Sequence, residues 1–300
     1  MKTEAYQGQG LILAVYPNLV SAAFQNKQIT LSRQPGKEIL VGDLVDLHNE
    51  KITRIHPRRN HFSRRAPAAR PGGRCKEQKM AANVDQVMAV LAAERPAPKW
   101  KLLDRYLAAA EAADLPAVIC ITKTDLLHDT NRQSLQRALE IYRRMDYPVF
   151  FTSTLTGEGM SDISAAIAGR TSIMIGKSGV GKSSLMNQLA PQAQRSTGNV
   201  GMESGKGRHT TSSAWLQTLE DGGALIDMPG TREFGLWFGE DDLAYIFRDL
   251  RPYLGTCRFG LDCRHDEEPG CAVREAVMTG NIHPWRYQSY LRLLDEEAGR

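Results

Sequence analysis

The stretch Gly176-Lys177-Ser178-Gly179-Val180-Gly181-Lys182-Ser183 decides the fold of this chain. It has the form G-x-x-x-x-G-K-[S/T], follows the apolar run 172–175 and opens a helical segment, which is the context that a phosphate-binding loop requires. In such a loop, backbone N–H groups surround the phosphates, the lysine reaches the β and γ phosphates, and the next hydroxyl ligates Mg²⁺. We therefore expect Lys182 to act on the phosphates, Ser183 to bind Mg²⁺, and Ser184 to lie against the nucleotide. A chance match in a glycine-rich loop is the competing interpretation.

Two later segments fit the same nucleotide site. Asp227-Met228-Pro229-Gly230 follows the apolar strand 224–226 and has the D-x-x-G form, in which the carboxylate holds Mg²⁺ through water and the glycine N–H meets the γ-phosphate. Between the two motifs lies the polar segment Gly207-Arg208-His209-Thr210-Thr211. We expect one of its threonines, Thr210 or Thr211, to complete the Mg²⁺ shell, and we take Thr211 as the ligand.

A base-reading motif precedes the phosphate loop. Thr122-Lys123-Thr124-Asp125 ends the apolar strand 117–121 and resembles the guanine motif N-K-x-D, whose carboxylate accepts from guanine N1–H and N2–H₂. Thr122 stands where asparagine is usual, which predicts a weaker tie to the base and the phosphate loop. Ser153-Thr154-Leu155 resembles the loop whose backbone N–H meets guanine O6. The competing interpretation is that both segments are ordinary surface loops.

The order of these motifs predicts the topology. Segments 84–90, 117–121, 148–151 and 172–175 read as strands, with helices at 99–113 and 133–144, so we expect a mostly parallel sheet covered on both faces. In Ras-like proteins the guanine motifs follow the phosphate loop, whereas here they precede it. The same sheet can form from a chain that begins at a different strand, provided that the N- and C-termini of the unpermuted fold lie close together. We therefore predict a circularly permuted P-loop GTPase domain over residues 81–239.

The N-terminal part has a different pattern. Apolar stretches at 11–16, 19–24 and 40–45, and the alternating stretch 51–55, are separated by Pro and Gly turns, which predicts a small antiparallel barrel over 1–65. A linker rich in Pro, Gly and Ala follows, at 66–80. Between Lys51 and Lys79 there are ten Lys or Arg and one acid, so this block carries +9 and the remainder of the chain −5. Such a basic block indicates a polyanion-binding surface, and a solvated linker is the alternative.

Composition narrows the class of protein. The chain is 42% hydrophobic and 24% charged, as is usual for a globular protein, and no apolar run is long enough to span a bilayer. The first residues have no signal-peptide character, and five cysteines do not suit a disulfide framework. We therefore expect a cytoplasmic protein with no membrane contact and reduced thiols.

Four residues near the C-terminus have the spacing of a metal site. Cys257, Cys263, His265 and Cys271 offer three thiolates and an imidazole within fifteen residues, which suits tetrahedral Zn²⁺. Four protein ligands close the site, so we expect one structural zinc ion inside a small helical domain at 240–300. The alternative is buried cysteines and a surface histidine. Of the other cysteines, Cys120 lies in an apolar strand and is expected in the core.

Taken together, these motifs resemble the ribosome small-subunit-dependent GTPase A family (the RsgA group) across nearly the whole chain. The resemblance is carried by the permuted order, the phosphate loop, the cysteine cluster and several short motifs: Ala82-Asn83-Val84-Asp85-Gln86, Gly207-Arg208-His209-Thr210-Thr211, and Asp227-Met228-Pro229-Gly230 with Arg232-Glu233-Phe234-Gly235-Leu236. It implies an N-terminal OB barrel, a permuted GTPase core and a C-terminal zinc domain. The family has four residues between the first two cysteines, whereas this chain has five.

The resemblance also implies partners and a role. Members bind the small (30S) ribosomal subunit late in its maturation and hydrolyse GTP to GDP faster when bound. We therefore expect GTP, GDP, Mg²⁺ and 16S rRNA as ligands of a monomer, with RNA contacts from Arg58, Arg59, Arg64 and Arg65. The alternatives are a GTP-switched RNA-binding regulator of translation on whole ribosomes and an ATP-dependent P-loop kinase, which Asp125 argues against.

The hydrolytic residue is the least evident part of the site. In Ras-type enzymes a glutamine directly after D-x-x-G orients the attacking water. Here that residue is Thr231, so we expect slow hydrolysis in isolation and another group that positions water. His209 is our candidate, because an imidazole can hold or accept from a water at neutral pH. The alternative is that His209 only contacts RNA or solvent.

Overall fold

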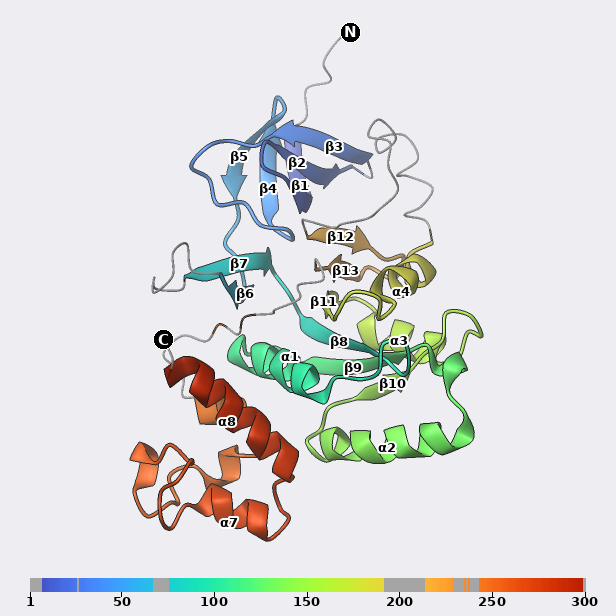
Figure 1. The fold of residues 1–300 in the computed structure, drawn as a ribbon. Helices are drawn as coiled ribbons and strands as arrows, with labels where there is room; N and C mark the ends of the chain where they lie inside the picture. Colours follow the sequence, from blue (N-terminus) through green and yellow to red (C-terminus); the bar gives the residue numbers. More distant parts are fainter. Residues whose placement is uncertain are drawn as a thin grey trace.

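The computed structural model describes residues 7–25, 27–66, 76–191, 214–228, 235, 237 and 243–298. Figure 1 shows three parts, with a β-rich N-terminal part above a central sheet and a helical C-terminal part below it. This arrangement confirms the predicted fold class. Among the described residues, no helix is both long and apolar enough to cross a membrane.

The N-terminal barrel is built from five antiparallel strands in the order β3-β2-β1-β4-β5. Their inward residues, such as Ile12, Val20 and Leu47, form a separate apolar core. The strands are β1 (Gln7–Val15), β2 (Leu19–Phe24), β3 (Lys27–Ser32), β4 (Leu44–His48) and β5 (Lys51–Ile55).

The third barrel strand predicted from sequence begins four residues later than expected. Residues 40–43 form a tight turn in which the Leu40 N–H donates to Asp43 Oδ2 at 2.7 Å. Gly42 has φ +88°, and a Cβ there would lie 2.3 Å from the Ala82 carbonyl oxygen. The apolar run Leu40–Val41 is therefore buried in a turn, so hydrophobicity alone misplaced the start of the strand.

A second hairpin follows the barrel. β6 (His61–Arg65) pairs antiparallel with β7 (Glu77–Ala82), and Arg65 N–H donates to the Gly235 carbonyl at 3.0 Å. The linker predicted over 66–80 thus includes residues 77–80 that lie in β7. The sequence did not indicate this strand, because many of its side chains are charged or polar. These side chains pair across the hairpin, as Glu77 does with His61 at 2.9 Å.

The central sheet has the strand order β10-β9-β8-β11-β13-β12. The first five strands are parallel, and β12 is antiparallel to β13. The phosphate-loop strand β11 lies between β8 and β13, so segments from both sides of it in the sequence flank it in space. The strands are β8 (Gln86–Ala92), β9 (Ala117–Thr122), β10 (Val149–Phe151), β11 (Thr171–Ile175), β12 (Trp215–Thr218) and β13 (Ala224–Asp227).

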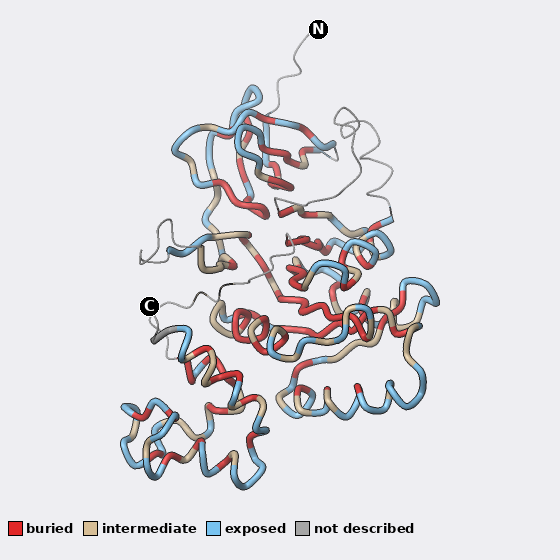
Figure 2. The backbone as a smooth tube through the Cα atoms, in the orientation of Figure 1, coloured by how far each residue is buried: buried red, intermediate tan, exposed pale blue. Residues whose placement is uncertain are grey.

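Helices cover both faces of this sheet, as predicted. Alternate residues of β8 point to opposite sides, where Val87 packs with α1 and α2 and Met88 packs with α3 and α4. Figure 2 shows the strands buried and the outer face of α2 exposed. α2 begins four residues earlier than the predicted 133. The helices are α1 (Trp100–Ala112), α2 (Asp129–Arg144), α3 (Met160–Ile167) and α4 (Lys182–Leu189), with the 3-10 turn η1 (Thr124–Leu126) after β9.

The C-terminal part is helical, as predicted, and packs on α1. Trp285 stacks on Trp100 with ring centroids 5.4 Å apart, and the buried Arg286 reaches Asp104 of α1. Its elements are α6 (Leu243–Ile246), the 3-10 turns η3 (Arg251–Tyr253) and η4 (Gly260–Asp262), α7 (Ala272–Met278) and α8 (Pro284–Ala298).

The barrel and the central sheet are continuous through one edge. Strand β1 pairs antiparallel with β12, with Ala14 opposite Trp215. The N-terminal barrel therefore extends the sheet that carries the phosphate loop.

Candidate functional site

The phosphate loop has the backbone that its sequence predicts. It joins β11 to α4, and Gly179 and Gly181 have φ of +84° and +100°, which only glycine adopts at little cost. A Cβ on Gly176 would lie 2.5 Å from the Val90 carbonyl oxygen. These glycines let the loop pass close to β8 and enter α4 directly after Gly181. The N–H groups of a glycine-rich loop at the start of a helix bind anions.

Lys182 lies at the bottom of this loop. It is buried, and its Nζ donates to the Gly176 carbonyl at 2.8 Å. Burial lowers the pKa of Lys182, and the negative charge of Asp227 opposes that shift. Burial in turn raises the pKa of the Asp227 carboxyl, and Lys182 opposes it. The strand ends of β11 and β13 thus bring two opposite charges into one buried place.

The same carboxylate is suited to a divalent cation. Asp227 Oδ1 is buried and, within the described part of the chain, has no hydrogen-bond partner. An unsatisfied buried oxygen is costly unless a ligand or ordered water meets it. Ser183 lies in the first turn of α4 and is exposed. Ser183 and Asp227 therefore fit Mg²⁺ bound together with nucleotide phosphates. The predicted Mg²⁺ ligand Thr211, and Gly230, lie outside the described residues, as do His209, Thr210 and Thr231.

The base-reading motif lies beside the phosphate loop, as its chain order predicts. Thr122 Oγ1 lies within hydrogen-bonding distance of the carbonyls of Leu91 and Val180. Lys123 Nζ donates to the carbonyls of Arg95 and Gly179, each at 2.6 Å. Thr122 therefore retains a direct contact with the phosphate loop, although it stands where asparagine is usual.

Asp125 and Ser153 are brought together from two different loops. The Ser153 hydroxyl donates to Asp125 Oδ1 at 2.6 Å and accepts from the N–H groups of Leu155 and Thr156 at 3.2 Å. Ser153 is buried, whereas Thr154 and Leu155 are exposed at the loop tip. A carboxylate held in place next to an exposed loop tip is an arrangement that suits guanine recognition.

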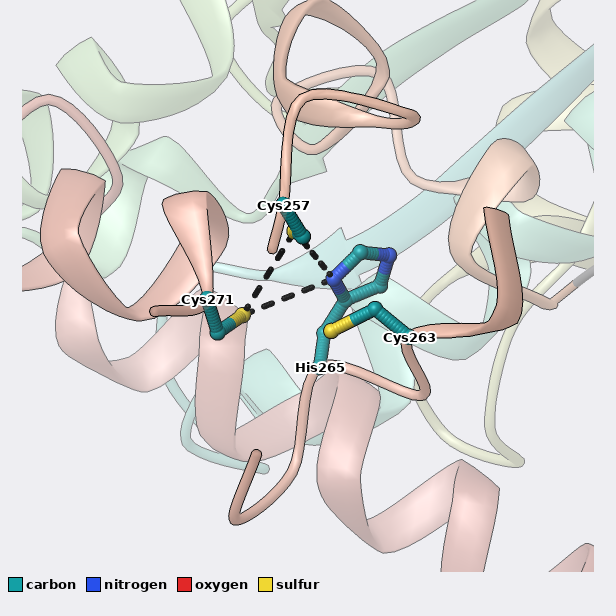
Figure 3. A group of neighbouring side chains, drawn as sticks. All are labelled: Cys257, Cys263, His265 and Cys271. Carbon is teal, nitrogen blue, oxygen red and sulfur yellow. Dashed lines mark hydrogen bonds between the residues drawn. The ribbon is translucent and has the colours of Figure 1, made fainter. Parts of the chain in front are cut away.

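The four side chains of the predicted metal centre are grouped as the ligands of a tetrahedral metal site would be (Figure 3). Sγ of Cys257 and of Cys271 lie 3.4 and 3.5 Å from His265 Nδ1 and 3.9 Å from each other. All four ligand atoms, including Cys263 Sγ, lie within 4.8 Å of one another. A tetrahedron with metal–sulfur bonds of about 2.3 Å has S···S edges of about 3.8 Å, so the donor set fits Zn²⁺.

The additional residue between Cys257 and Cys263 is accommodated without separating the ligands. The five intervening residues include the turn η4, where Gly260 has φ +57°, and His265 itself has φ +60°. Cys120 is buried in β9 as predicted, and burial raises its pKa to about 12. Cys75 lies outside the described residues.

The four predicted RNA-binding arginines have different surroundings. The Arg58 guanidinium is bound by Asp43, at 2.7 and 2.9 Å, and by Glu38 at 2.9 Å. Arg59 is the most exposed side chain of these ion pairs, at 63%, although it reaches Asp85 at 2.8 Å. Arg64 Nε donates to Gln78 at 2.9 Å. The backbone of Arg65 contacts Gly235.

The sequence analysis did not identify two carboxylates, those of Asp43 and Glu158, that hold predicted site residues in place. Asp43 is buried and carries no motif, so only its position after a glycine in an apolar stretch could have suggested a capped turn. Glu158 contacts Thr124 and Arg132 beneath the base-reading loop. Neither pairing can be inferred from spacing, because the partners are remote in sequence.

Comparison with known proteins gives a consistent result. The profile of the RsgA GTPase family matches residues 55–237. Two relatives are each named small ribosomal subunit biogenesis GTPase RsgA. The one from Actinobacillus pleuropneumoniae serotype 5b (strain L20) is 42% identical over 273 residues, covering 88% of this chain and 77% of the relative. The one from Gemmatimonas aurantiaca is 45% identical over 271 residues, covering 88% and 86%.

Two solved structures resemble the whole chain. The crystal structure of YjeQ from Thermotoga maritima matches with a TM-score of 0.72 at 28% identity, covering 98% of this chain and 100% of that one. YloQ, described as a circularly permuted GTPase, matches with a TM-score of 0.68 at 28% identity, covering 98% and 96%.

Proposed function

Because the chain belongs to the RsgA GTPase family, we propose that it is a GTPase that binds the small (30S) ribosomal subunit and acts late in its maturation. It hydrolyses GTP to GDP and phosphate, and the bound subunit accelerates that reaction. One observation carries the proposal: the permuted sheet brings the base-reading motif into contact with the phosphate loop, where Thr122 bonds to the Val180 carbonyl and Lys123 to the Gly179 carbonyl. With small subunits as the partner, the cytoplasm is the place of action.

The residues divide the work of phosphoryl transfer. The phosphate-loop N–H groups and Lys182 bind and orient the β and γ phosphates, and Lys182 offsets the charge that develops there. When bound, Mg²⁺ supplies further charge compensation, with Ser183, Thr211 and Asp227 as its protein ligands. Asp125 selects guanine, and Thr154 and Leu155 complete the base loop.

We assign water positioning to His209. Thr231 stands where a glutamine would orient the water, and His209 is the histidine of the segment between the two phosphate motifs. His209→Ala should abolish most of the stimulation by small subunits and leave GTP affinity nearly unchanged. Lys182→Ala should instead lose nucleotide binding. If His209→Ala is stimulated as well as the wild type, a group supplied by the ribosome positions the water.

The deciding experiment is turnover of GTP and ATP, each with and without purified small subunits and with whole ribosomes. We expect GTP to be preferred and its turnover to rise at least tenfold with small subunits, since a partner that completes a GTPase site can accelerate it far more. Equal turnover of ATP and GTP would contradict the proposal. Stimulation by whole ribosomes alone would favour a regulator of translation.

We also propose one structural Zn²⁺ held by Cys257, Cys263, His265 and Cys271, and RNA contacts from the basic block between Lys51 and Lys79. Arg59, Arg64 and Arg65 are suited to phosphate contacts, whereas Arg58 is committed to Asp43. Charge reversal at Arg59, Arg64 and Arg65 should weaken binding to small subunits and flatten its salt dependence. GDP affinity should not change.

A further inference from the structure

Glu158 connects three segments beneath the base-reading loops. It lies between Ser153 and α3, and its Oε2 accepts from Thr124 Oγ1 at 2.5 Å. Arg132 of α2 donates to both carboxylate oxygens, at 2.8 and 2.9 Å. One carboxylate thus joins the loop after β9, the first turns of α2 and the loop after β10.

The backbone around Glu158 has a fixed course. Its carbonyl accepts from the Ser153 N–H at 3.0 Å, and the Gly157 N–H donates to the Ser153 carbonyl at 2.9 Å. The next residue, Gly159, has φ +64°, and a Cβ there would lie 1.9 Å from the Phe151 carbonyl oxygen. The loop therefore cannot shift on β10 without breaking these contacts.

Both supports of Asp125 lead to Glu158. Thr124 precedes Asp125, is buried, and is bound through its hydroxyl by the Glu158 carboxylate. Ser153 donates to Asp125 Oδ1 and is bound through its N–H by the Glu158 carbonyl. The guanine-reading carboxylate is therefore supported by residue 158 in two ways: through the Glu158 side chain at Thr124, and through the Glu158 main-chain carbonyl at Ser153.

Arg132 keeps Glu158 in the form that these contacts need. Its guanidinium, together with the Thr124 hydroxyl, lowers the pKa of Glu158, so the carboxylate is charged at neutral pH. Hydrogen bonds to an ionised acceptor are stronger than those between neutral groups.

We propose that Glu158 is a positioning residue for guanine recognition, which holds the Asp125 carboxylate and the Ser153 loop in the geometry that discriminates guanine from other bases. Its side chain acts through Thr124, its main-chain carbonyl holds the Ser153 loop, and it does not touch the nucleotide. The proposal rests on the GTPase function proposed above.

The test measures equilibrium binding of GDP and IDP to the full chain. IDP lacks the 2-amino group, so it loses one of the two bonds to Asp125. Glu158→Ala should weaken GDP binding about tenfold, the scale of one lost hydrogen bond to a charged group, and should reduce the preference for GDP over IDP. Glu158→Gln keeps one acceptor oxygen, so its GDP affinity and its preference for GDP over IDP should lie between those of the wild type and those of Glu158→Ala. Glu140→Ala, an exposed carboxylate on α2, is the matched control and should match the wild type.

A second variant keeps the proposal testable if Glu158→Ala does not fold. Thr124→Val removes the hydroxyl at nearly constant volume and should lower the preference for GDP over IDP, and its effect should not add to that of Glu158→Gln. An unchanged preference in folded variants, or an equal loss for both nucleotides, overturns the proposal. Failure of the wild-type chain to bind GDP would instead contradict the proposed function.

Discussion

The C-terminal domain and the N-terminal barrel are attached to the central sheet in opposite ways. Arg286 of α8 is 2% exposed and binds Asp104 at 2.6 Å and Asp249 at 2.9 Å. The barrel is attached through the β1–β12 pair, through Leu13 and Val41, which are buried in the apolar core of the central sheet, and through surface ion pairs such as Arg59 with Asp85. One junction buries its charges, and the other leaves them in water.

This difference determines what each junction can tolerate. Buried charges are costly to leave unpaired, so the C-terminal junction has one stable arrangement. Exposed ion pairs contribute little to stability, because water can solvate both charges when the pair separates. We infer that buried charges hold the C-terminal domain to the core, whereas the exposed charges at the barrel junction contribute little to holding the barrel in place.

Loss of the metal centre should have the largest effect. Cys263→Ala should lower zinc below one ion per chain and unfold the segment around α7, because metal binding supplies folding free energy, about 10–16 kcal/mol in zinc-finger peptides. Metal analysis measures the zinc content, and limited proteolysis measures the unfolding around α7. Cys120→Ala, a buried cysteine outside the centre, should keep its zinc. A fully folded, zinc-free protein would show that the cluster consists of ordinary buried thiols.

Arg286→Ala tests the buried junction directly. It leaves Asp104 and Asp249 without their cationic partner and should lower the free energy of unfolding by about 3–5 kcal/mol. Chemical denaturation followed by tryptophan fluorescence measures this, since Trp100 and Trp285 stack across the same junction. A loss below about 1 kcal/mol would mean that the charges are not buried in solution.

Arg58→Ala should have an intermediate effect on stability, because the change leaves only one buried carboxylate, that of Asp43, without its cationic partner. Asp43 is fully buried, but the guanidinium that binds it is partly exposed. We expect a loss of about 2–3 kcal/mol in the stability of the barrel. Urea denaturation measures it, and Arg54→Ala, an exposed arginine on β5, is the control. Equal midpoints for the two variants would contradict the structural role of Arg58.

Arg59→Ala should have the smallest effect on stability. The Arg59–Asp85 pair is exposed, so its loss should cost less than about 1 kcal/mol and less still in high salt. Binding to small subunits should nevertheless weaken. A loss of stability as large as that of Arg58→Ala would remove the contrast between the two junctions.

The parts of the molecule that sequence predicted well depend on local pattern. The course of the loop 176–183, the alternation of strands and helices in the core and the grouping of Cys257, Cys263, His265 and Cys271 all follow from residues close together in the chain. The segment 122–125 lies beside that loop, as the motif order and the permuted sheet predict.

The parts that sequence missed depend on remote partners. Strand β7 is polar and becomes a strand only through pairing with β6, and the turn at Leu40 requires the buried Asp43 carboxylate. Arg58 is a further example, because its partners Asp43 and Glu38 lie 15 and 20 residues away in the sequence. Charge count alone therefore overestimates the number of basic side chains without an acidic partner.

The pairing of β1 with β12 has a consequence for synthesis of the chain. Ala14 leaves the ribosome about 200 residues before Trp215. At a translation rate of about 5–20 residues per second, the barrel strand waits roughly 10–40 seconds for its neighbour. During that time the barrel can pair its own five strands, while β8 to β10 lack the strand β11 that joins them to the rest of the sheet. The part of β1 around Ala14, which lies beyond its pairing with β4, remains an open edge until the last third of the chain emerges, and an open edge can pair with other strands.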